Sequence, residues 1–322
     1  MAKTPLYKRL KYQNIFFFVV LLAFVIFLIV LIKQSTTNDT SSSSVSDSSS
    51  ANSVSDNNSG NSSAVQNNTE TVLGKIEYTY MKFSESAIHD GTLILISPNY
   101  SFSGEAPQDC ISSYDYMFND NRDKLFSIRN NEVKARGIAL ENVKKMMSDF
   151  FSLYGSASVV LMNAYNPNDK TSEMSAGYSV EFFYHNSDGT YSIFNPIGTY
   201  SWIADNAYRY GFIMRYPSEK ATVTGISDGT GVIRYVGMPH SQIMYKNNMC
   251  LEEYLEFLKD YSYDNAIGYT TDDGKNYAIY YAASEGAETN IKIPTDSDSE
   301  AYKFTISGNN SDGFIITVSL PD

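Results

Sequence analysis

The stretch "WIADNAYRYGFIMRYPSEKATVTGI", residues 202–226, and the stretch "IRYVGMPHSQIMYKNNMCLEEYL", residues 233–255, decide the fold. The first predicts a helix over residues 201–210 that ends at Gly211, because glycine commonly follows the last residue of a helix. The second leads into a predicted helix over residues 250–261. Its apolar face recurs at spacings of three and four, at Leu251, Tyr254, Leu255 and Leu258.

The region before these stretches adds a third helix and three strands. In "LENVKKMMSDFFSLYG", residues 140–155, apolar side chains recur at helical spacing and Gly155 stands where the helix should end. The segment "GTLILISPNY", residues 91–100, predicts a strand with a β-branched apolar centre. Residues 156–165 and 178–184 predict two more strands, the first of them buried.

Beyond residue 261 the pattern changes to hairpins. The turns "DDGK", residues 272–275, and "GNNSDG", residues 308–313, separate alternating runs such as "NYAIYYAA" and "GFIITVSL". We therefore expect residues 73–260 to form one domain and residues 261–322 a C-terminal antiparallel β appendage.

The N-terminus predicts a membrane anchor. Residues 15–32 are an unbroken apolar run, long enough as a helix to cross most of a hydrocarbon core of about 30 Å. A cleaved signal peptide is the alternative, but its apolar region is shorter and ends in small residues, whereas this run ends at Lys33. Four cations within residues 1–14 precede the run, which places this basic tail in the cytoplasm. The rest of the chain is then extracytoplasmic, on a single-pass protein of the cell membrane.

Residues 33–72 consist almost entirely of small and polar residues, chiefly Ser, Asn, Thr and Asp. Such a composition cannot bury enough apolar surface to offset the entropy of ordering. We expect a disordered tether with a root-mean-square reach of about 35 Å, which keeps the folded part near the membrane.

Charge and cysteine content limit the partners. The net charge of -12 and the lack of a basic run outside the N-terminal tail argue against nucleic acid. Cys110 and Cys250 are the two cysteines. Outside the membrane they could pair or stay free, and their separation in sequence does not decide between the two.

Residues 202–226 and 233–255 closely resemble the VanY-like D-alanyl-D-alanine carboxypeptidases, zinc enzymes that trim peptidoglycan stem peptides. The resemblance covers about residues 91–259, and the β tail resembles an appendage of some members. It implies an α+β domain with a small antiparallel sheet, packed helices and a zinc cleft across the sheet.

The residues that the resemblance assigns to zinc are largely replaced. The family pattern Ser-x-His-x-x-Gly-x-Ala-x-Asp falls on "SEMSAGYSVE", residues 172–181, which puts Met174 at the histidine and Glu181 at the aspartate. The later pattern Glu-Pro-Trp-His-x-Arg-Tyr puts Val232 at the second zinc histidine. A thioether is too soft for zinc and valine cannot ligate a metal, so Glu181 alone could still coordinate.

The catalytic positions are also replaced. Gly229 stands at the catalytic glutamate, and Asn166 stands at the arginine that grips the substrate carboxylate. Asp228, one residue before the lost glutamate, could supply a base, but a base has little to activate without a metal-bound water. We therefore assign no catalytic residue and no metal ligand.

The three histidines give no replacement site. His185 follows Glu181 by four residues, about 13 Å along a strand, which is too far to share an ion. His240 lies where the family places no ligand, and His89 precedes the first predicted strand. We expect all three at the surface or half-buried.

Two functions compete, and a purely structural membrane protein is a third possibility that the sequence does not separate from the first. The first is a degenerate, non-catalytic carboxypeptidase-like domain that binds or scaffolds at the cell wall, where its partner is a peptidoglycan peptide or a cell-envelope protein; it needs no cofactor. The second is an active D-alanyl-D-alanine carboxypeptidase with an atypical site, which would need zinc.

Overall fold

The structure is a computed structural model that describes Leu73, residues 76–118, 125–155 and 158–227, Gly229, and residues 231–321. The basic tail, the membrane helix and the tether predicted over residues 1–72 lie outside the described residues. All described residues belong to one unit, Gly60–Asp322. Within them, no helix has both the length and the apolar character that a membrane span requires.

The central sheet has the strand order β3-β5-β6-β9-β8, and β7 extends it by pairing with β6. Its strands are β3 (Ser127–Ile128), β5 (Val159–Asn163), β6 (Ser179–His185), β7 (Tyr191–Ile193), β8 (Phe212–Met214) and β9 (Val232–Tyr235). The expectation of an antiparallel sheet is wrong for one pair, because β3 and β5 run parallel. A parallel pair needs a long crossover, and helix α3 (Gly137–Tyr154) supplies it.

Helix α3 packs on one face of this sheet and confirms the predicted helix. Gly155 follows it with φ 80°, a left-handed value that suits glycine. Its buried residues join apolar side chains of β5, β6 and β9 in one core. The α3 residues in this core are Leu140, Val143, Met146, Met147 and Phe150.

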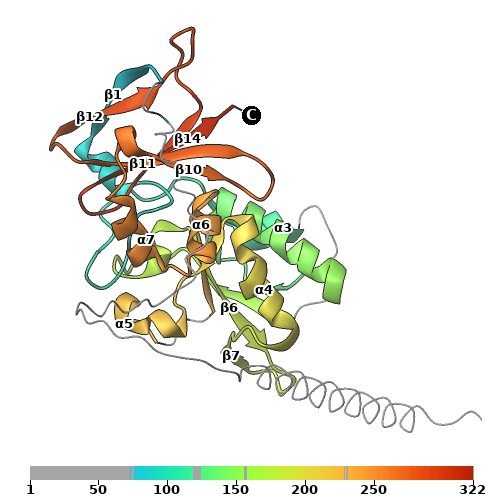
Figure 1. Cartoon of the computed structure of the whole chain (residues 1–322). Helices are drawn as coiled ribbons and strands as arrows, with labels where there is room; N and C mark the ends of the chain where they lie inside the picture. Colours follow the sequence, from blue (N-terminus) through green and yellow to red (C-terminus); the bar gives the residue numbers. More distant parts are fainter. Residues whose placement is uncertain are drawn as a thin grey trace, which may run out of the picture. The chain divides into compact units, whose positions relative to one another are not determined.

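Shorter helices complete the region around the sheet (Figure 1). They are α2 (Ser113–Phe118), α4 (Ser201–Asn206), α5 (Ala221–Thr224), α6 (His240–Lys246) and α7 (Leu251–Leu258). The helix predicted over residues 201–210 is α4 continued by a 3-10 turn, Ala207–Tyr210, and Gly211 ends it in the left-handed conformation. A two-stranded ribbon of β2 (Cys110–Ser112) and β4 (Lys134–Arg136) precedes α3.

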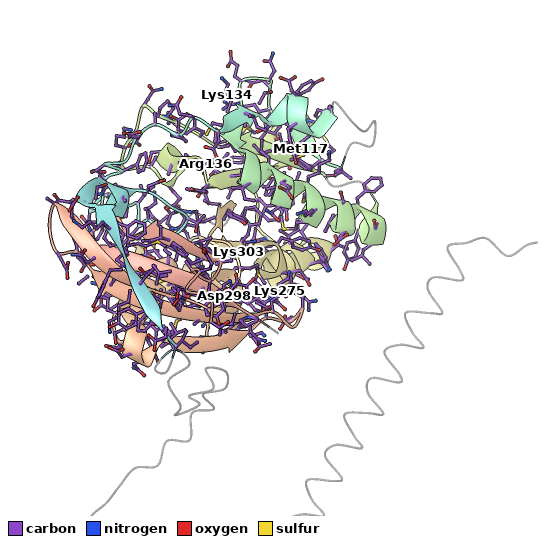
Figure 2. The ribbon with its side chains drawn as sticks, turned by 90° about the horizontal axis from the view of Figure 1, so that it is seen from above. Met117, Lys134, Arg136, Lys275, Asp298 and Lys303 are labelled. Atoms are coloured by element: carbon purple, nitrogen blue, oxygen red, sulfur yellow. The ribbon has the colours of Figure 1, made fainter. Side chains whose placement is uncertain are left out.

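The C-terminal strands form a second sheet of order β10-β11-β14-β13, which confirms the predicted hairpins. Its strands are β10 (Ile267–Thr270), β11 (Asn276–Ala283), β13 (Phe304–Gly308) and β14 (Gly313–Leu320). A separate ribbon pairs β12 (Glu288–Pro294) with β1 (Tyr78–Ser84), the first described strand of the chain. Figure 1 shows β1 beside β12 at the C-terminal end of the molecule. In Figure 2, Lys275, Asp298 and Lys303 mark these strands, and Met117, Lys134 and Arg136 mark the region of α2 and β4.

The strand predicted over residues 91–100 is wrong. This segment makes only an isolated bridge, Ser97 with Tyr100, although Leu93 to Ile96 are buried. Its backbone is satisfied elsewhere: the Leu93 amide donates to the Ser307 hydroxyl at 2.9 Å, and the Leu95 amide donates to the Asn309 carbonyl at 3.2 Å. The apolar content correctly indicates burial. The backbone amides, however, are bonded by a side chain and a loop carbonyl instead of by a neighbouring strand.

Three aromatic residues of the stretches 202–226 and 233–255 pack in or beside the core. Their place in these family-like stretches predicts this packing. Phe212 is fully buried, and Trp202 and Tyr235 are half-buried against the same cluster. A second cluster joins α6 and α7 to β10, β11 and β14. The C-terminal sheet is therefore part of the packed structure.

Candidate functional site

The two faces of β6 and β9 have different environments because side chains alternate along a strand. Val180, Phe182 and Ile233 point into the core beneath α3. Glu181 and Val232 lie on the opposite face and are directly opposed across the two strands. One face of the sheet therefore packs against the core, and the opposite face can form the wall of a binding site.

A cleft of about 800 Å³ lies over this second face, large enough for a small peptide. Four residues at the zinc-ligand and carboxylate-binding positions of the family patterns line this cleft, namely Asn166, Met174, Glu181 and Val232. The backbone amide of Asn166 donates to the Met174 carbonyl at 3.1 Å. Glu181 lies opposite Asn163 on one neighbouring strand and opposite Val232 on the other. Residues from four separate segments are thus brought together.

A single 3-10 turn, Glu173–Ala176, positions Met174. The Ser172 hydroxyl accepts from the Met174 amide at 3.3 Å and caps this turn. Gly177 then ends it at φ 75°, and a Cβ there would lie 2.8 Å from the Cys110 sulfur. The glycine is required both by its left-handed backbone and by this close approach. Met174 itself is buried at the cleft wall.

Gly229 lies on the loop before β9, where its carbonyl accepts from the Val232 amide at 3.0 Å. A Cβ at Gly229 would lie 2.3 Å from the ring of Tyr216, which itself lines the cleft. The space beside this position is therefore filled by an aromatic ring. Burial, together with the nearby charge of Glu173, raises the pKa of Tyr216, so its phenol stays neutral. Asp228, the candidate base, lies outside the described residues.

Sequence reasoning missed a buried charge network behind the cleft. Glu173 accepts from the Arg215 Nε at 2.9 Å, from the Ser179 hydroxyl at 3.1 Å, and from Arg234 through a short ion pair. Arg215 also makes a bidentate pair with Glu252 at 2.7 and 3.0 Å. Burial would lower the Arg215 pKa, but the two carboxylates raise it overall.

This network ties the site to the rest of the fold. The Arg234 guanidinium also donates to the carbonyls of Thr92 and Ile94 at 3.1 and 3.0 Å, in the buried segment wrongly predicted as a strand. Both arginines are fully buried, so each needs its carboxylate partner. Glu173 stands at an unspecified position of the family pattern, and for this reason the pattern gave no signal for it.

The residues present do not fit the zinc ion that the resemblance implies. Of the three ligand positions, Met174 carries a thioether, Val232 carries no donor, and only Glu181 carries a hard oxygen ligand. One Glu181 oxygen already accepts from the Asn163 amide at 2.6 Å. Among the described residues, no three His, Cys, Asp or Glu side chains gather closely enough to hold a metal ion.

The histidines do not rescue the site. His185 is exposed and His89 is half-buried. The expectation for His240 is wrong, because it is buried between α6, α7 and β14, where its Nδ1 bonds to the Tyr254 hydroxyl at 2.8 Å and its Nε2 to the Thr317 hydroxyl at 2.9 Å. Burial lowers the His240 pKa to about 3. This neutral histidine joins the family domain to the C-terminal sheet.

The cysteines form no disulfide and are not activated. Both thiols are free, Cys110 half-buried and Cys250 buried at the start of α7. Burial raises the pKa of each to about 11. A thiol that stays protonated at neutral pH is a poor nucleophile, so neither residue supports covalent catalysis.

The mixed sheet, with α3 on one face and a cleft large enough for a small peptide over the other, defines an α+β domain with one main cleft wall built on β6 and β9. Residues 122–238 match the VanY family, described as D-alanyl-D-alanine carboxypeptidase. A D-alanyl-D-alanine carboxypeptidase of Enterococcus faecium is 31% identical over 262 residues, which cover 76% of this chain and 81% of that protein. The chain belongs to the VanY-like family of zinc peptidases.

Two further comparisons agree. A D-alanyl-D-alanine carboxypeptidase of Enterococcus faecalis (strain ATCC 700802 / V583) is 42% identical over 85 residues, 26% of this chain and 30% of that protein. The vancomycin resistance D,D-dipeptidase VanXYg, solved in complex with a D-Ala-D-Ala phosphinate analogue, superposes with a TM-score of 0.64 at 24% identity. That alignment covers 76% of this chain and 100% of VanXYg, so the two share a fold.

Proposed function

We propose that this chain is a membrane-anchored, extracytoplasmic protein whose carboxypeptidase-like cleft binds peptidoglycan stem peptides at the cell wall without hydrolysing them. The observation that carries the proposal is that the cleft is present while two of the three zinc-ligand positions hold residues that do not bind zinc. The cleft of about 800 Å³ keeps the size for a peptide, while Met174 and Val232 stand where zinc ligands belong. The anchor over residues 15–32 would hold this cleft near the wall.

A second candidate is an active D-alanyl-D-alanine carboxypeptidase with an atypical site. Membership of the family favours it, as does the activity named for the Enterococcus faecium relative. It would need ligands beyond Glu181, with Asp228 as the general base in place of the lost glutamate. In this candidate, zinc would supply the activated water.

Metal analysis and hydrolysis of one peptide separate the two candidates. The purified protein is assayed for bound zinc, for binding of an acyl-D-Ala-D-Ala peptide by calorimetry, and for release of D-alanine with and without a chelator. We expect peptide binding, no stoichiometric zinc and no D-alanine. Tightly bound zinc with hydrolysis that the chelator abolishes would establish the active enzyme instead.

Restoring the ligands tests whether the cleft kept the family geometry. The triple variant M174H/E181D/V232H should bind zinc, since it supplies three ligands of the nitrogen and oxygen type. The single variant E181D is the matched control and should not. Adding G229E requires the Tyr216 ring to move, so we expect zinc binding without full carboxypeptidase activity. Failure of the triple variant to bind zinc, in a protein that melts normally, would show that the cleft backbone has departed from the family.

A further inference from the structure

The cleft keeps one cation, although the family's arginine position is occupied by Asn166. Among the described residues that line the cleft, Arg129 is the single Lys or Arg. Its side chain is exposed at the end of β3. Its backbone amide donates to the Leu161 carbonyl at 3.1 Å, which fixes where the side chain leaves the sheet.

Asn163 holds Arg129 in a defined orientation. The Arg129 Nη1 donates to the Asn163 Oδ1 at 3.1 Å, and the Asn163 Nδ2 donates to the Glu181 Oε2 at 2.6 Å. A guanidinium can only donate and a carboxylate can only accept, so the amide can be oriented in only one way. Asn163 therefore lies as a spacer between a positive and a negative group.

This spacer leaves the Arg129 charge available to a ligand. Within the described ranges, no carboxylate lies at ion-pair distance from Arg129, and none of these residues accepts from its remaining guanidinium nitrogens. Glu173, in contrast, is offset by Arg215 and Arg234. The guanidinium keeps its planar set of donors, which matches a carboxylate in two-point contact.

The other charged residues of the cleft give it polarity. Glu132, Asp169, Glu173 and Glu181 also line it; Glu173 is paired with two arginines and Glu181 is bonded to Asn163, so among the described lining residues only Arg129 offers an anion an unpaired cation. A peptide with a terminal carboxylate would therefore bind with that carboxylate beside Arg129. An ammonium group of the same ligand would be favoured near Glu132 and Asp169.

We infer that Arg129 has taken over recognition of the peptide's terminal carboxylate from the position now occupied by Asn166. The inference rests on the proposed function, since it assigns the specificity of the same cleft. Arg129 reaches the cleft from the end of β3, whereas Asn166, at the family's arginine position, lies between β5 and the Glu173–Ala176 turn. The recognised class is a short peptide with a free C-terminal carboxylate.

Calorimetric titration of two matched peptides tests the inference. The probes are acetyl-D-Ala-D-Ala with a free carboxylate and the same peptide as a C-terminal amide, titrated into the wild type, R129Q and the control K134Q. Lys134, labelled in Figure 2, is an exposed cation of β4. It is not among the residues that line the cleft. We expect the wild type and K134Q to bind the free acid roughly tenfold or more tightly than the amide. R129Q should lose this preference and keep its affinity for the amide.

The outcomes separate the inference from the proposed function. Equal affinity of the wild type for the two peptides, or an equal loss for both in R129Q, overturns the role of Arg129 and leaves peptide binding standing. If the wild type binds neither peptide, the proposed function and the inference both fall. Because Arg129 is exposed, R129Q should melt like the wild type, and R129K should recover part of the preference without the two-point contact.

Discussion

Replacing Glu173 by glutamine should strongly destabilise the protein, because this residue is the shared anion of two fully buried arginines. Glu173 is 4% exposed, and the side chains of Arg215 and Arg234 are 0% exposed. A glutamine has the same shape but offers one acceptor oxygen instead of two, and its amide nitrogen would face a guanidinium donor.

The size of the effect follows from what each arginine retains. Arg215 keeps its bidentate pair with Glu252, whereas Arg234 keeps only carbonyl acceptors and becomes a buried cation without an anion. Breaking a buried ion pair from one side costs about 3 to 5 kcal/mol. We expect E173Q to lose about this much free energy of unfolding, and E252Q to lose less, because Arg215 then keeps Glu173 and the Glu252 side chain is partly exposed.

Urea unfolding measures both variants. Trp202 is the single tryptophan of the chain and lies 5.9 Å from the Phe150 ring at the edge of the core, so its fluorescence reports the transition. A loss below about 1 kcal/mol for E173Q, or a larger loss for E252Q than for E173Q, would refute the assignment of Glu173 as the central anion. The double variant E173Q/R234M should be less destabilised than E173Q alone, because it removes the unpaired charge.

Three further changes test the fold and the topology. F212A should lower the free energy of unfolding by about 3 to 5 kcal/mol, because Phe212 is fully buried; a loss under about 0.5 kcal/mol would contradict its position. The His240 pKa is about 3 in the folded protein and 6.5 unfolded, so its contribution to stability is complete above pH 6.5 and is lost as the pH falls towards 3. The free energy of unfolding measured in urea should fall by up to about 1.4 kcal/mol per pH unit in this range, less steeply in H240Q; equal slopes would exclude His240 as the cause. Protease added to intact cells without an outer permeability barrier should cut within residues 33–72 and release the folded unit, whereas protection of that segment beside a cleaved surface control would reverse the orientation.

The regular elements with strong periodicity could be predicted from the sequence. The helix Gly137–Tyr154 and the C-terminal hairpins follow from apolar spacing and turn residues, which act locally. The segment of residues 91–100 could not be assigned in this way. Its composition indicates burial, but whether a buried backbone pairs with a strand or with Ser307 and Asn309 depends on contacts more than 200 residues away.

In the cleft, too, some features could be predicted from the sequence and others depend on distant contacts. Met174, Glu181 and Val232 could be placed together because the family pattern aligns them, and the structure sets them around one cavity. Arg129 and Glu173 gave no signal, since their roles arise from charges brought together by folding. The sequence predicts His240 at the surface or half-buried, whereas two hydroxyl partners allow it to be buried in neutral form.

The pairing of β1 with β12 decides how mechanical load enters the folded unit. A pull on the chain before the folded unit meets the buried Leu73 first and then β1, which is held to β12 over the register from Tyr78–Pro294 to Ser84–Glu288. A pull along the strand would strain all of these pairs at once, which resists rupture better than opening them one after another. The cleft strands β6 and β9 belong to a different sheet. Tension on the N-terminal segment would therefore be borne by Leu73 and the β1–β12 ribbon before it could distort the cleft.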